Sequence, residues 1–489
     1  MLLSSKPKED MNTLLSDFRA LDLVILRGQT FSLLFCPERF VLMKLSDEGL
    51  AAAELALAVD CSDTLEDDKN INLFLQTAVN YVSAFGRVEI SSTELALSMS
   101  ATQTLPKLVL MVNNYCNLKC AYCYEHGTAF KDPARCITQS SIRTTIDKCY
   151  EFFNAIGTVM FIGGEPTLSE NAIEEACEYS LSKASILKRE KPTFGMITNG
   201  VKISEYLHQV IDRYEIQVTF SVDGPKATND LVRIRHDGSG SYDALSANIK
   251  RYARNHPDKL SIESTVTRAQ SETGLSVSEL LKFISDEFGV NTPHIAIAGL
   301  PTGHPLMPIY QEAAGLDKDF SAAIDLSVIN ILADMTSGDS SFHRPRISFV
   351  ADMMRALASK SATIAMCSAG TAQIVVDSRA DVYPCWMFAG NAAFRMGNIV
   401  SDSIVKILGS SVVSRVRSNT KMTNANCSKC YARFVCHACI GNNQNTTGAI
   451  EKMDPRFCDT TRNSLVTILS AIVTAHADPE QWKKIILAA

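Results

Sequence analysis

The sequence predicts an α/β fold, and three observations along residues 101–300 support this fold class. Short apolar runs of strand length recur through this stretch, and amphipathic segments of helical length lie between them. Because strands that alternate with helices pair in parallel, the expected structure is a parallel sheet covered by helices. Polar, glycine-containing or cysteine-containing segments follow five of the apolar runs, and parallel barrels bind their ligands at the carboxyl ends of the strands.

This core is expected to contain six strands joined by helices. The apolar runs that predict the strands are Leu108–Val112, Val159–Ile162, Phe194–Thr198, Val218–Val222, Ile262–Val266 and His294–Ala298. The amphipathic segments that predict the helices are Ile142–Phe153, Ala172–Leu187, Val201–Tyr214, Tyr242–Tyr252 and Ser276–Phe288.

The segments on either side of this core follow different patterns, and a chain of 489 residues is expected to form two to four domains. Residues 1–100 predict a small α+β domain with a hairpin, two helices and a short strand: Phe31–Phe35, Phe40–Leu45, Asp47–Val59, Asn72–Phe85 and Val88–Ser91. Residues 301–365 predict a proline-rich connector with helices near Phe320–Met335 and Ile347–Ala358. Residues 366–489 predict a C-terminal domain rich in cysteine.

The composition is that of an ordinary soluble protein, because 46% of the residues are hydrophobic and 20% are charged. The net charge of −6 and the lack of a dense basic stretch indicate that nucleic acid is not a partner. We expect no membrane partner and a cytoplasmic location, because residues 1–10 hold no signal-peptide core and Leu465–Ala475 is too short to span a bilayer. Cytoplasmic thiols stay reduced, so the cysteines are expected to bind metal rather than to form disulfides. Five isolated cysteines are expected to be small buried hydrophobic residues: Cys36, Cys61, Cys136, Cys149 and Cys177.

Three cysteines with the spacing C-x3-C-x2-C follow the first expected strand, at Cys116, Cys120 and Cys123. Three thiolates can hold three irons of a [4Fe–4S] cluster and leave the fourth iron open for the amino and carboxylate groups of S-adenosylmethionine. The alternatives are a zinc site or buried thiols, but structural zinc needs four ligands. The run resembles the signature of the radical SAM superfamily, in which an aromatic residue at the place of Tyr122 packs near the adenine. The resemblance implies a partial (β/α)6 TIM-like barrel over residues 101–300 and formation of a 5′-deoxyadenosyl radical.

Further segments at the expected strand ends fit the same cofactor. The run Gly163-Gly164-Glu165-Pro166 resembles the GGEP turn of that family, where glycines let the backbone approach the methionine ammonium and the glutamate accepts a hydrogen bond from it. Asn199, Ser221 and Asp223 either bond the ribose hydroxyls and the methionine carboxylate or cap the strand ends. Arg268 either pairs with that carboxylate or is solvated. No role is assigned to His126, His236 and His437.

Seven more cysteines follow in the C-terminal segment: Cys367, Cys385, Cys427, Cys430, Cys436, Cys439 and Cys458. Their order resembles the SPASM extension of radical SAM maturases, which implies two auxiliary [4Fe–4S] clusters and three clusters in all. By matching position, the resemblance assigns Cys427, Cys430, Cys436 and Cys458 to an outer cluster. It assigns Cys367, Cys385 and Cys439 to an inner cluster with an open iron.

The C-terminal segment departs from the SPASM pattern at two places. Two residues separate Cys436 from Cys439 where that family usually has three, and Ala380 takes the place of a usual glycine. A single zinc site within residues 427–439 is the alternative, and it leaves three of the seven cysteines without a role.

Three classes of function are open. The chain resembles peptide maturases of the sactipeptide and ranthipeptide type, which implies an enzyme that forms a thioether or another side-chain crosslink in a ribosomally made peptide. The implied partners are a precursor peptide with a leader sequence and an electron donor such as flavodoxin or ferredoxin. Residues 1–100 then resemble a winged-helix-like leader-recognition domain, and the alternative for them is a structural cap.

The other two classes differ in their chemistry. The second class is another type of protein maturation, such as carbon–carbon crosslinking or anaerobic sulfatase maturation. Sulfatase maturases place an aspartate base after the second extension cysteine, where this chain has Trp386, and an indole takes up no proton. The third class is a non-enzymatic iron–sulfur electron carrier, which the open-iron triplet and the GGEP-like turn disfavour.

Overall fold

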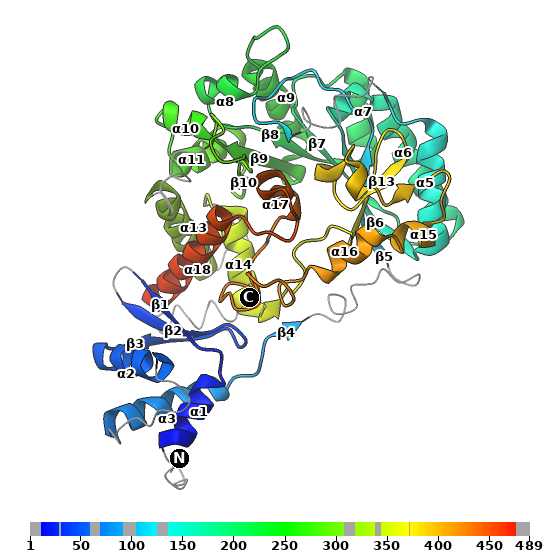
Figure 1. Cartoon of the computed structure of the whole chain (residues 1–489). Helices are drawn as coiled ribbons and strands as arrows, with labels where there is room; N and C mark the ends of the chain where they lie inside the picture. The colour runs from blue at the N-terminus through cyan, green and yellow to red at the C-terminus, as the bar shows by residue number, and fades with distance from the viewer. Residues whose placement is uncertain are drawn as a thin grey trace.

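The computed structural model describes residues 11–28, 31–58, 69–90, 104–124, 135–307, 318–337, 344–370 and 372–475. Cys61 and His126 lie outside these ranges. Figure 1 shows a small N-terminal unit in blue, a sheet with helices in cyan and green, and a C-terminal segment in yellow to red that runs between them.

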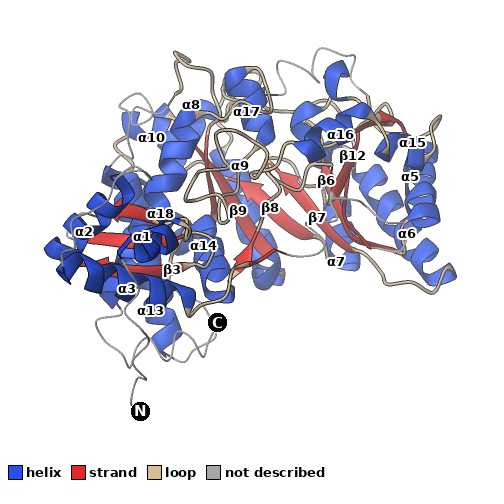
Figure 2. Cartoon of the chain, turned by 60° about the horizontal axis from the view of Figure 1, so that its bottom comes forward, coloured by secondary structure: helices blue, strands red, loops and turns tan. Residues whose placement is uncertain are grey.

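The core is a parallel sheet whose six strands match the expected ones. They are β5 Thr104–Met111, β6 Ala155–Ile162, β7 Thr193–Thr198, β8 Gln217–Ser221, β9 Leu260–Val266 and β10 His294–Ile297. Neighbours along the chain are neighbours in the sheet, and every pairing among the six is parallel. Over the described residues the sheet has two edges and does not close, which agrees with a partial barrel (Figure 2).

Three strands that the sequence did not predict extend this sheet beyond β5. Strand β12 Gln373–Val376 pairs in parallel with β5, and β13 Asp381–Tyr383 and β14 Gly397–Asn398 follow in antiparallel order. The C-terminal segment is therefore built into the core sheet. Ala380 lies in the turn before β13 with φ 65, so this turn keeps the left-handed conformation that glycine normally provides.

The helices that join the strands also have the expected places. They are α5 Gln139–Phe152, α6 Glu170–Ile186, α7 Glu205–Tyr214, α9 Tyr242–Asn255 and α11 Val277–Phe288. Helix α7 begins later than expected because the Ser204 hydroxyl caps it, accepting from the Leu207 N–H at 2.9 Å. The short helices α8 Lys226–Val232 and α10 Arg268–Glu272 were not expected.

The N-terminal unit packs three helices against a three-stranded antiparallel sheet. Its elements are α1 Met11–Arg19, β1 Val24–Arg27, β2 Ser32–Cys36, β3 Val41–Leu45, α2 Asp47–Ala58 and α3 Lys69–Ser83. The sequence predicted the hairpin and the two helices after it, but not α1 or β1. Strand β2 is buried on both faces: Leu34 and Cys36 pack with the three helices, and Leu33 and Phe35 pack into the main core. The unit is therefore attached to the core through its sheet.

Two further contacts tie this unit to the C-terminal segment. Strand β4 Glu89–Ile90 pairs in parallel with β11 Ser361–Ala362. Arg433, which is 4% exposed, donates to Asp22 Oδ2 at 2.5 Å and to the carbonyl oxygen of Cys430 at 3.1 Å. One guanidinium thus joins the N-terminal unit to the loop that carries the outer cysteines.

The connector and the C-terminal segment are mostly helical. Their helices are α13 Lys318–Ser337, α14 Ser348–Ser359, α15 Ile404–Leu408, α16 Ser411–Ser418, α17 Ile440–Thr447 and α18 Pro455–Ala475. The first two match the helices expected in the connector, and α13 packs along α18 (Figure 1). None of the helices in the described ranges is both long enough and apolar enough to cross a membrane.

Candidate active site

The carboxyl ends of β5 to β8 bring the predicted cofactor residues to one edge of the sheet. The first cysteine loop follows β5, the Gly163-Gly164-Glu165-Pro166 turn follows β6, Asn199 follows β7 and Asp223 follows β8. Because these strands are parallel neighbours, the segments after them converge.

The first cysteine loop is held by the segment that ends α8. This loop carries Cys116, Cys120 and Cys123, all partly buried. Backbone hydrogen bonds of 2.8 and 2.9 Å run from Lys119 to Ile234 and from Ala121 to Val232. This support could not be predicted, because the two segments are far apart along the chain.

His236 belongs to the same support. Its Nε2 lies 3.0 Å from the carbonyl oxygen of Cys116, although the sequence suggested no role for it. Burial, together with the charge of Glu165, raises the pKa of Cys116 to about 12. Metal ligation needs the thiolate, so cluster binding at this loop releases protons.

The turn after β6 approaches the cysteine loop so closely that only glycine fits. A Cβ at Gly164 would lie 2.2 Å from the carbonyl oxygen of Tyr115, and one at Gly163 would lie 2.7 Å from that of Asn113. The Glu165 N–H donates to the Tyr115 carbonyl at 2.9 Å, and Asn113 Nδ2 donates to the Glu165 carbonyl at 2.7 Å. The two glycines therefore allow direct backbone coupling between the turn and the cysteine loop.

The carboxylate of Glu165 organises the ends of two strands. Glu165 is 1% exposed, and Pro166 after it begins a short 3-10 helix. Oε1 of Glu165 accepts hydrogen bonds from the hydroxyls of Thr167 at 2.7 Å and Thr198 at 2.6 Å. Oε2 of Glu165 accepts one from the Asn199 N–H at 2.7 Å. Burial raises the pKa of Glu165, and these hydrogen bonds oppose the rise. A bond from a methionine ammonium to Glu165 stays a prediction.

A buried network joins the cysteine loop to the end of β8. Tyr122 donates to Asp223 Oδ2 at 2.6 Å, and Arg233 donates to the Tyr122 hydroxyl. Arg233 and Asp223 form an ion pair of 3.7 Å, and their side chains are 8% and 0% exposed. Burial raises the pKa of Asp223, and the charge of Arg233 opposes this. The sequence pointed to Tyr122 and Asp223 separately but missed Arg233, which links them.

The remaining cofactor candidates lie at the same edge. Asn199 Nδ2 lies 3.5 Å from Cys116 Sγ, so this side chain faces the cysteine loop. Ser221 ends β8 and is partly exposed. Arg268 begins α10, and its Nε donates to the carbonyl oxygen of Met307 at 3.2 Å. Their contacts with a cofactor stay predictions.

The seven C-terminal cysteines form two groups of near neighbours. Burial raises the pKa of Cys385 in the inner group, and the nearby Cys439 and Cys367 raise it further. Burial, together with the neighbouring Cys436, Cys427 and Cys430, raises the pKa of Cys458 in the outer group to about 12. Ligation of a cluster by either group stays a prediction.

Lys421 lies at the junction of these two groups. It is 1% exposed, and its Nζ donates to the carbonyl oxygen of Cys436 at 2.6 Å. Its backbone N–H donates to the carbonyl oxygen of Ile364 at 2.8 Å, shortly before Cys367. Burial raises the pKa of both Cys436 and Cys367, and the positive charge of Lys421 opposes the rise at each.

The described cysteines do not converge on a single point. Within the described ranges, no group of three or more His, Cys, Asp or Glu side chains is placed to hold one metal ion. A [4Fe–4S] cluster binds each thiolate through a different iron, so its ligands surround a volume instead. The cluster assignment and the alternative of one zinc site within residues 427–439 both stay predictions.

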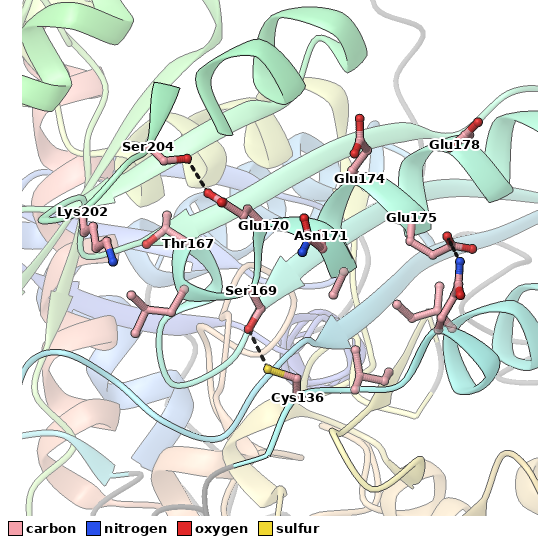
Figure 3. Close-up of a pocket in the computed structure, with 15 residues that line it drawn as sticks. Cys136, Thr167, Ser169, Glu170, Asn171, Glu174, Glu175, Glu178, Lys202 and Ser204 are labelled. Atoms are coloured by element: carbon pink, nitrogen blue, oxygen red, sulfur yellow. Dashed lines mark hydrogen bonds between the residues drawn. The ribbon is translucent and has the colours of Figure 1, made fainter. Parts of the chain in front are cut away.

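A pocket of about 780 Å³ lies beside the starts of α5 and α6 (Figure 3). Cys136 lines it and is exposed, so the prediction that this cysteine is buried was wrong. It lies in the loop before α5, with its Sγ 3.3 Å from the hydroxyl of Ser169. Acidic side chains on the pocket wall are paired, Glu174 with Arg213 and Glu175 with Arg143. The other isolated cysteines in the described ranges are buried as expected: Cys36, Cys149 and Cys177.

Comparison with known families identifies two domains. The model of the radical SAM superfamily matches residues 110–272, which include the first cysteine loop and the turn after β6. The model of SPASM, an iron–sulfur cluster-binding domain, matches residues 367–431.

Two curated relatives differ in how much of the chain they match. The uncharacterized protein MJ0907 of Methanocaldococcus jannaschii is 32% identical over 27% of this chain and 44% of its own length. A cysteine-type anaerobic sulfatase-maturating enzyme of Clostridium perfringens is 23% identical over 60% of this chain and 78% of its own length. The chain therefore spans less than half of the first relative.

Two solved structures share the fold. Native anSMEcpe with bound AdoMet and Cp18Cys peptide is 20% identical, with a TM-score of 0.61 over 76% of this chain and 99% of its own. SuiB of Streptococcus suis bound to S-adenosylmethionine is 16% identical, with a TM-score of 0.50 over 89% of this chain and 98% of its own. At these identities the likeness shows the fold alone.

Proposed function

The chain is a radical SAM enzyme with a SPASM extension, and from this premise we propose that it modifies a ribosomally synthesised peptide. The proposed reaction forms a thioether or another crosslink between side chains of that peptide. One observation carries the proposal: a single chain holds three thiols at the carboxyl edge of its sheet and two further groups of thiols near its C-terminus. Peptide oxidation needs both a radical source and a destination for electrons.

The residues at the sheet edge fit the binding of S-adenosylmethionine. Cys116, Cys120 and Cys123 would hold the first cluster, and the turn after β6 would lie beside the methionine group of the cofactor. Tyr122 would lie against the adenine. When bound, the clusters and S-adenosylmethionine supply a 5′-deoxyadenosyl radical and accept electrons from the substrate.

The two C-terminal groups differ in how completely they would enclose a cluster. Four thiols in the outer group would close it, because each iron then has a protein ligand. Three thiols in the inner group would leave one position, and a substrate cysteine is suited to it. In this proposal the inner group places the substrate sulfur next to the carbon that it joins.

The N-terminal unit is proposed to bind the leader of the precursor peptide. Strand β3 pairs with β2 on one side, and among the described residues no strand pairs with its other side. Helix α3 packs near β3 and exposes Leu73 and Tyr81, which are 66% and 43% exposed and share one helix face. An open strand edge beside an apolar helix face suits an extended peptide, which would add a strand there.

Maturation of a sulfatase is the second candidate. It is favoured by the sequence match that covers 78% of the length of a sulfatase-maturating enzyme. Against it stands Trp386, which follows Cys385 at the place where those enzymes carry an aspartate base. Trp386 packs among apolar residues and the C-terminal cysteines. An indole cannot accept the substrate proton that formation of an aldehyde releases.

Mass analysis of a peptide product tests the proposed function. The reconstituted enzyme is incubated without oxygen with dithionite, S-adenosylmethionine and a short cysteine-containing peptide encoded beside its gene. We expect 5′-deoxyadenosine and a peptide lighter by two hydrogens for each crosslink. Formylglycine in a sulfatase-derived peptide, with no change in the encoded peptide, would establish the second candidate instead.

Charges on the exposed face of α3 are expected to weaken leader binding. The double variant Leu73→Asp with Tyr81→Asp should bind the full precursor at least about tenfold more weakly, or about 1.4 kcal/mol, because the apolar contact is lost. Fluorescence anisotropy with a labelled leader measures the affinity, and cleavage of S-adenosylmethionine without peptide should not change.

Ile186→Asp is the control for this pair, because Ile186 is 73% exposed on α6, outside the N-terminal unit. Point variants are preferable to removal of residues 1–100, since that removal would uncover the core that Leu33 and Phe35 pack against. Unchanged affinity in the double variant would favour a purely structural cap.

A further inference from the structure

Lys421 is fixed at both ends to the segments that carry the two C-terminal cysteine groups. Its ammonium donates to the carbonyl oxygen of Cys436 in the outer group at 2.6 Å. Its backbone N–H donates at 2.8 Å to the carbonyl oxygen of Ile364, on the segment that leads to Cys367 in the inner group. With 1% of its surface exposed, the side chain has little freedom to move away from either group.

Burial makes this charge unusual. A cation that leaves water loses its hydration, and polar or negatively charged partners must offset the loss. Arg433 is also buried beside Cys430, but the carboxylate of Asp22 neutralises its charge. Lys429, between Cys427 and Cys430, lies on the surface, and Arg462 is partly exposed and paired with Asp459. Solvent screens such charges, whereas the field of a buried ammonium is screened much less.

A fixed positive charge favours the reduced state of an iron–sulfur cluster. A [4Fe–4S] cluster gains one negative charge when it takes up one electron and passes from the 2+ to the 1+ state. Cluster potentials respond to nearby charge, to hydrogen bonds and to solvent exposure. A cation in a water-poor site therefore raises the potential more than a cation on the surface does.

We propose that Lys421 is a positioning residue that raises the reduction potential of the auxiliary clusters, most of all that of the outer cluster whose ligand Cys436 it contacts. It thereby makes them better acceptors of the electron that substrate oxidation releases. The inference rests on the proposed function only in taking the seven C-terminal cysteines as cluster ligands.

Redox titration of the auxiliary clusters tests this role without substrate. The parent is the full-length protein with Cys116, Cys120 and Cys123 replaced by alanine, so that only the auxiliary clusters contribute to the EPR spectrum. Lys421→Met removes the charge and the donor, Lys421→Gln keeps a donor without the charge, and Lys421→Arg keeps the charge. Lys429→Met is the matched control, because it removes the same charge from an exposed position in the same region.

The expected pattern separates charge from hydrogen bonding. Lys421→Met and Lys421→Gln should both lower the outer-cluster potential, so that its reduction equilibrium falls about tenfold, or about 59 mV for one electron. Lys421→Arg and Lys429→Met should shift it far less.

Three results would overturn the inference. The first is an unchanged potential in both neutral variants with their iron retained, and the second is a shift in Lys421→Met that Lys421→Gln does not show. The third is loss of auxiliary iron from both neutral variants, which would make Lys421 an assembly residue. A parent protein without any auxiliary iron would overturn the cluster assignment itself, and this inference with it.

Discussion

Replacing Cys116, Cys120 and Cys123 together by alanine is expected to abolish the reductive cleavage of S-adenosylmethionine. The reason is that these three thiols lie on one loop at the carboxyl edge of the parallel sheet, next to the turn after β6. The product 5′-deoxyadenosine is measured after incubation with dithionite under anaerobic conditions. We expect none above the rate without enzyme.

Iron content shows whether the loss is specific. The wild-type chain is expected to hold about twelve irons after reconstitution, and the triple variant about eight, because the two C-terminal groups keep their clusters. Cys177→Ala is the control, since Cys177 is buried on α6, belongs to none of the three cysteine groups and should keep both iron and activity. Cleavage at the wild-type rate in the triple variant would refute the assignment of these three ligands, and zinc as the main metal would refute the cluster count.

Asp223→Ala is expected to destabilise the protein by about 3–5 kcal/mol, because it leaves the guanidinium of Arg233 buried without its counter-charge. The two side chains are almost fully buried, and the lost carboxylate also accepts hydrogen bonds from Tyr122 and the Thr265 N–H. Anaerobic thermal and urea unfolding, followed by circular dichroism, measure the loss. Because the variant also loses the hydrogen bond that holds Tyr122 of the cysteine loop, the iron content of the first cluster should fall as well.

Two further variants identify the cause of this loss. Asp243→Ala breaks an ion pair with Lys226 whose side chains are 75% and 58% exposed, and it should change stability little. The double variant Asp223→Leu with Arg233→Met removes both buried charges and should be less destabilised than Asp223→Ala. If Asp223→Ala and the double variant are destabilised equally, the lost hydrogen bonds, and not the uncompensated charge of Arg233, cause the loss of stability.

The parallel core could be predicted from the sequence because each strand is a local apolar run and each helix a local amphipathic one. Strands β12, β13 and β14 could not, since elements of four, three and two residues show no periodicity. They form by successive pairing, β12 with β5, β13 with β12 and β14 with β13. Strand β1 also escaped prediction, and its four residues are stabilised by pairing with β2.

The candidate site divides in the same way. The cysteine loop and the turn after β6 could be predicted from short sequence motifs, because the residues of each motif are close together in the sequence. Arg233 and His236 belong to no such motif. They contact Tyr122 and Cys116, which lie more than a hundred residues earlier in the chain, only in the folded protein. Cys136 was misplaced because exposure of a single thiol depends on its loop and not on its residue type.

Arg433 has a consequence for any attempt to recombine the N-terminal unit with other enzymes. Its guanidinium reaches Asp22 at 2.5 Å and Glu38 at 3.8 Å while it also donates to Cys430. A chimera whose N-terminal unit lacked carboxylates at the positions of Asp22 and Glu38 would leave Arg433 buried beside the outer cysteine loop without a counter-charge. Under the proposed leader binding, substrate range can diversify on the exposed face of α3 and the β3 edge, whereas the face that contacts Arg433 must change together with the cysteine loop that it touches.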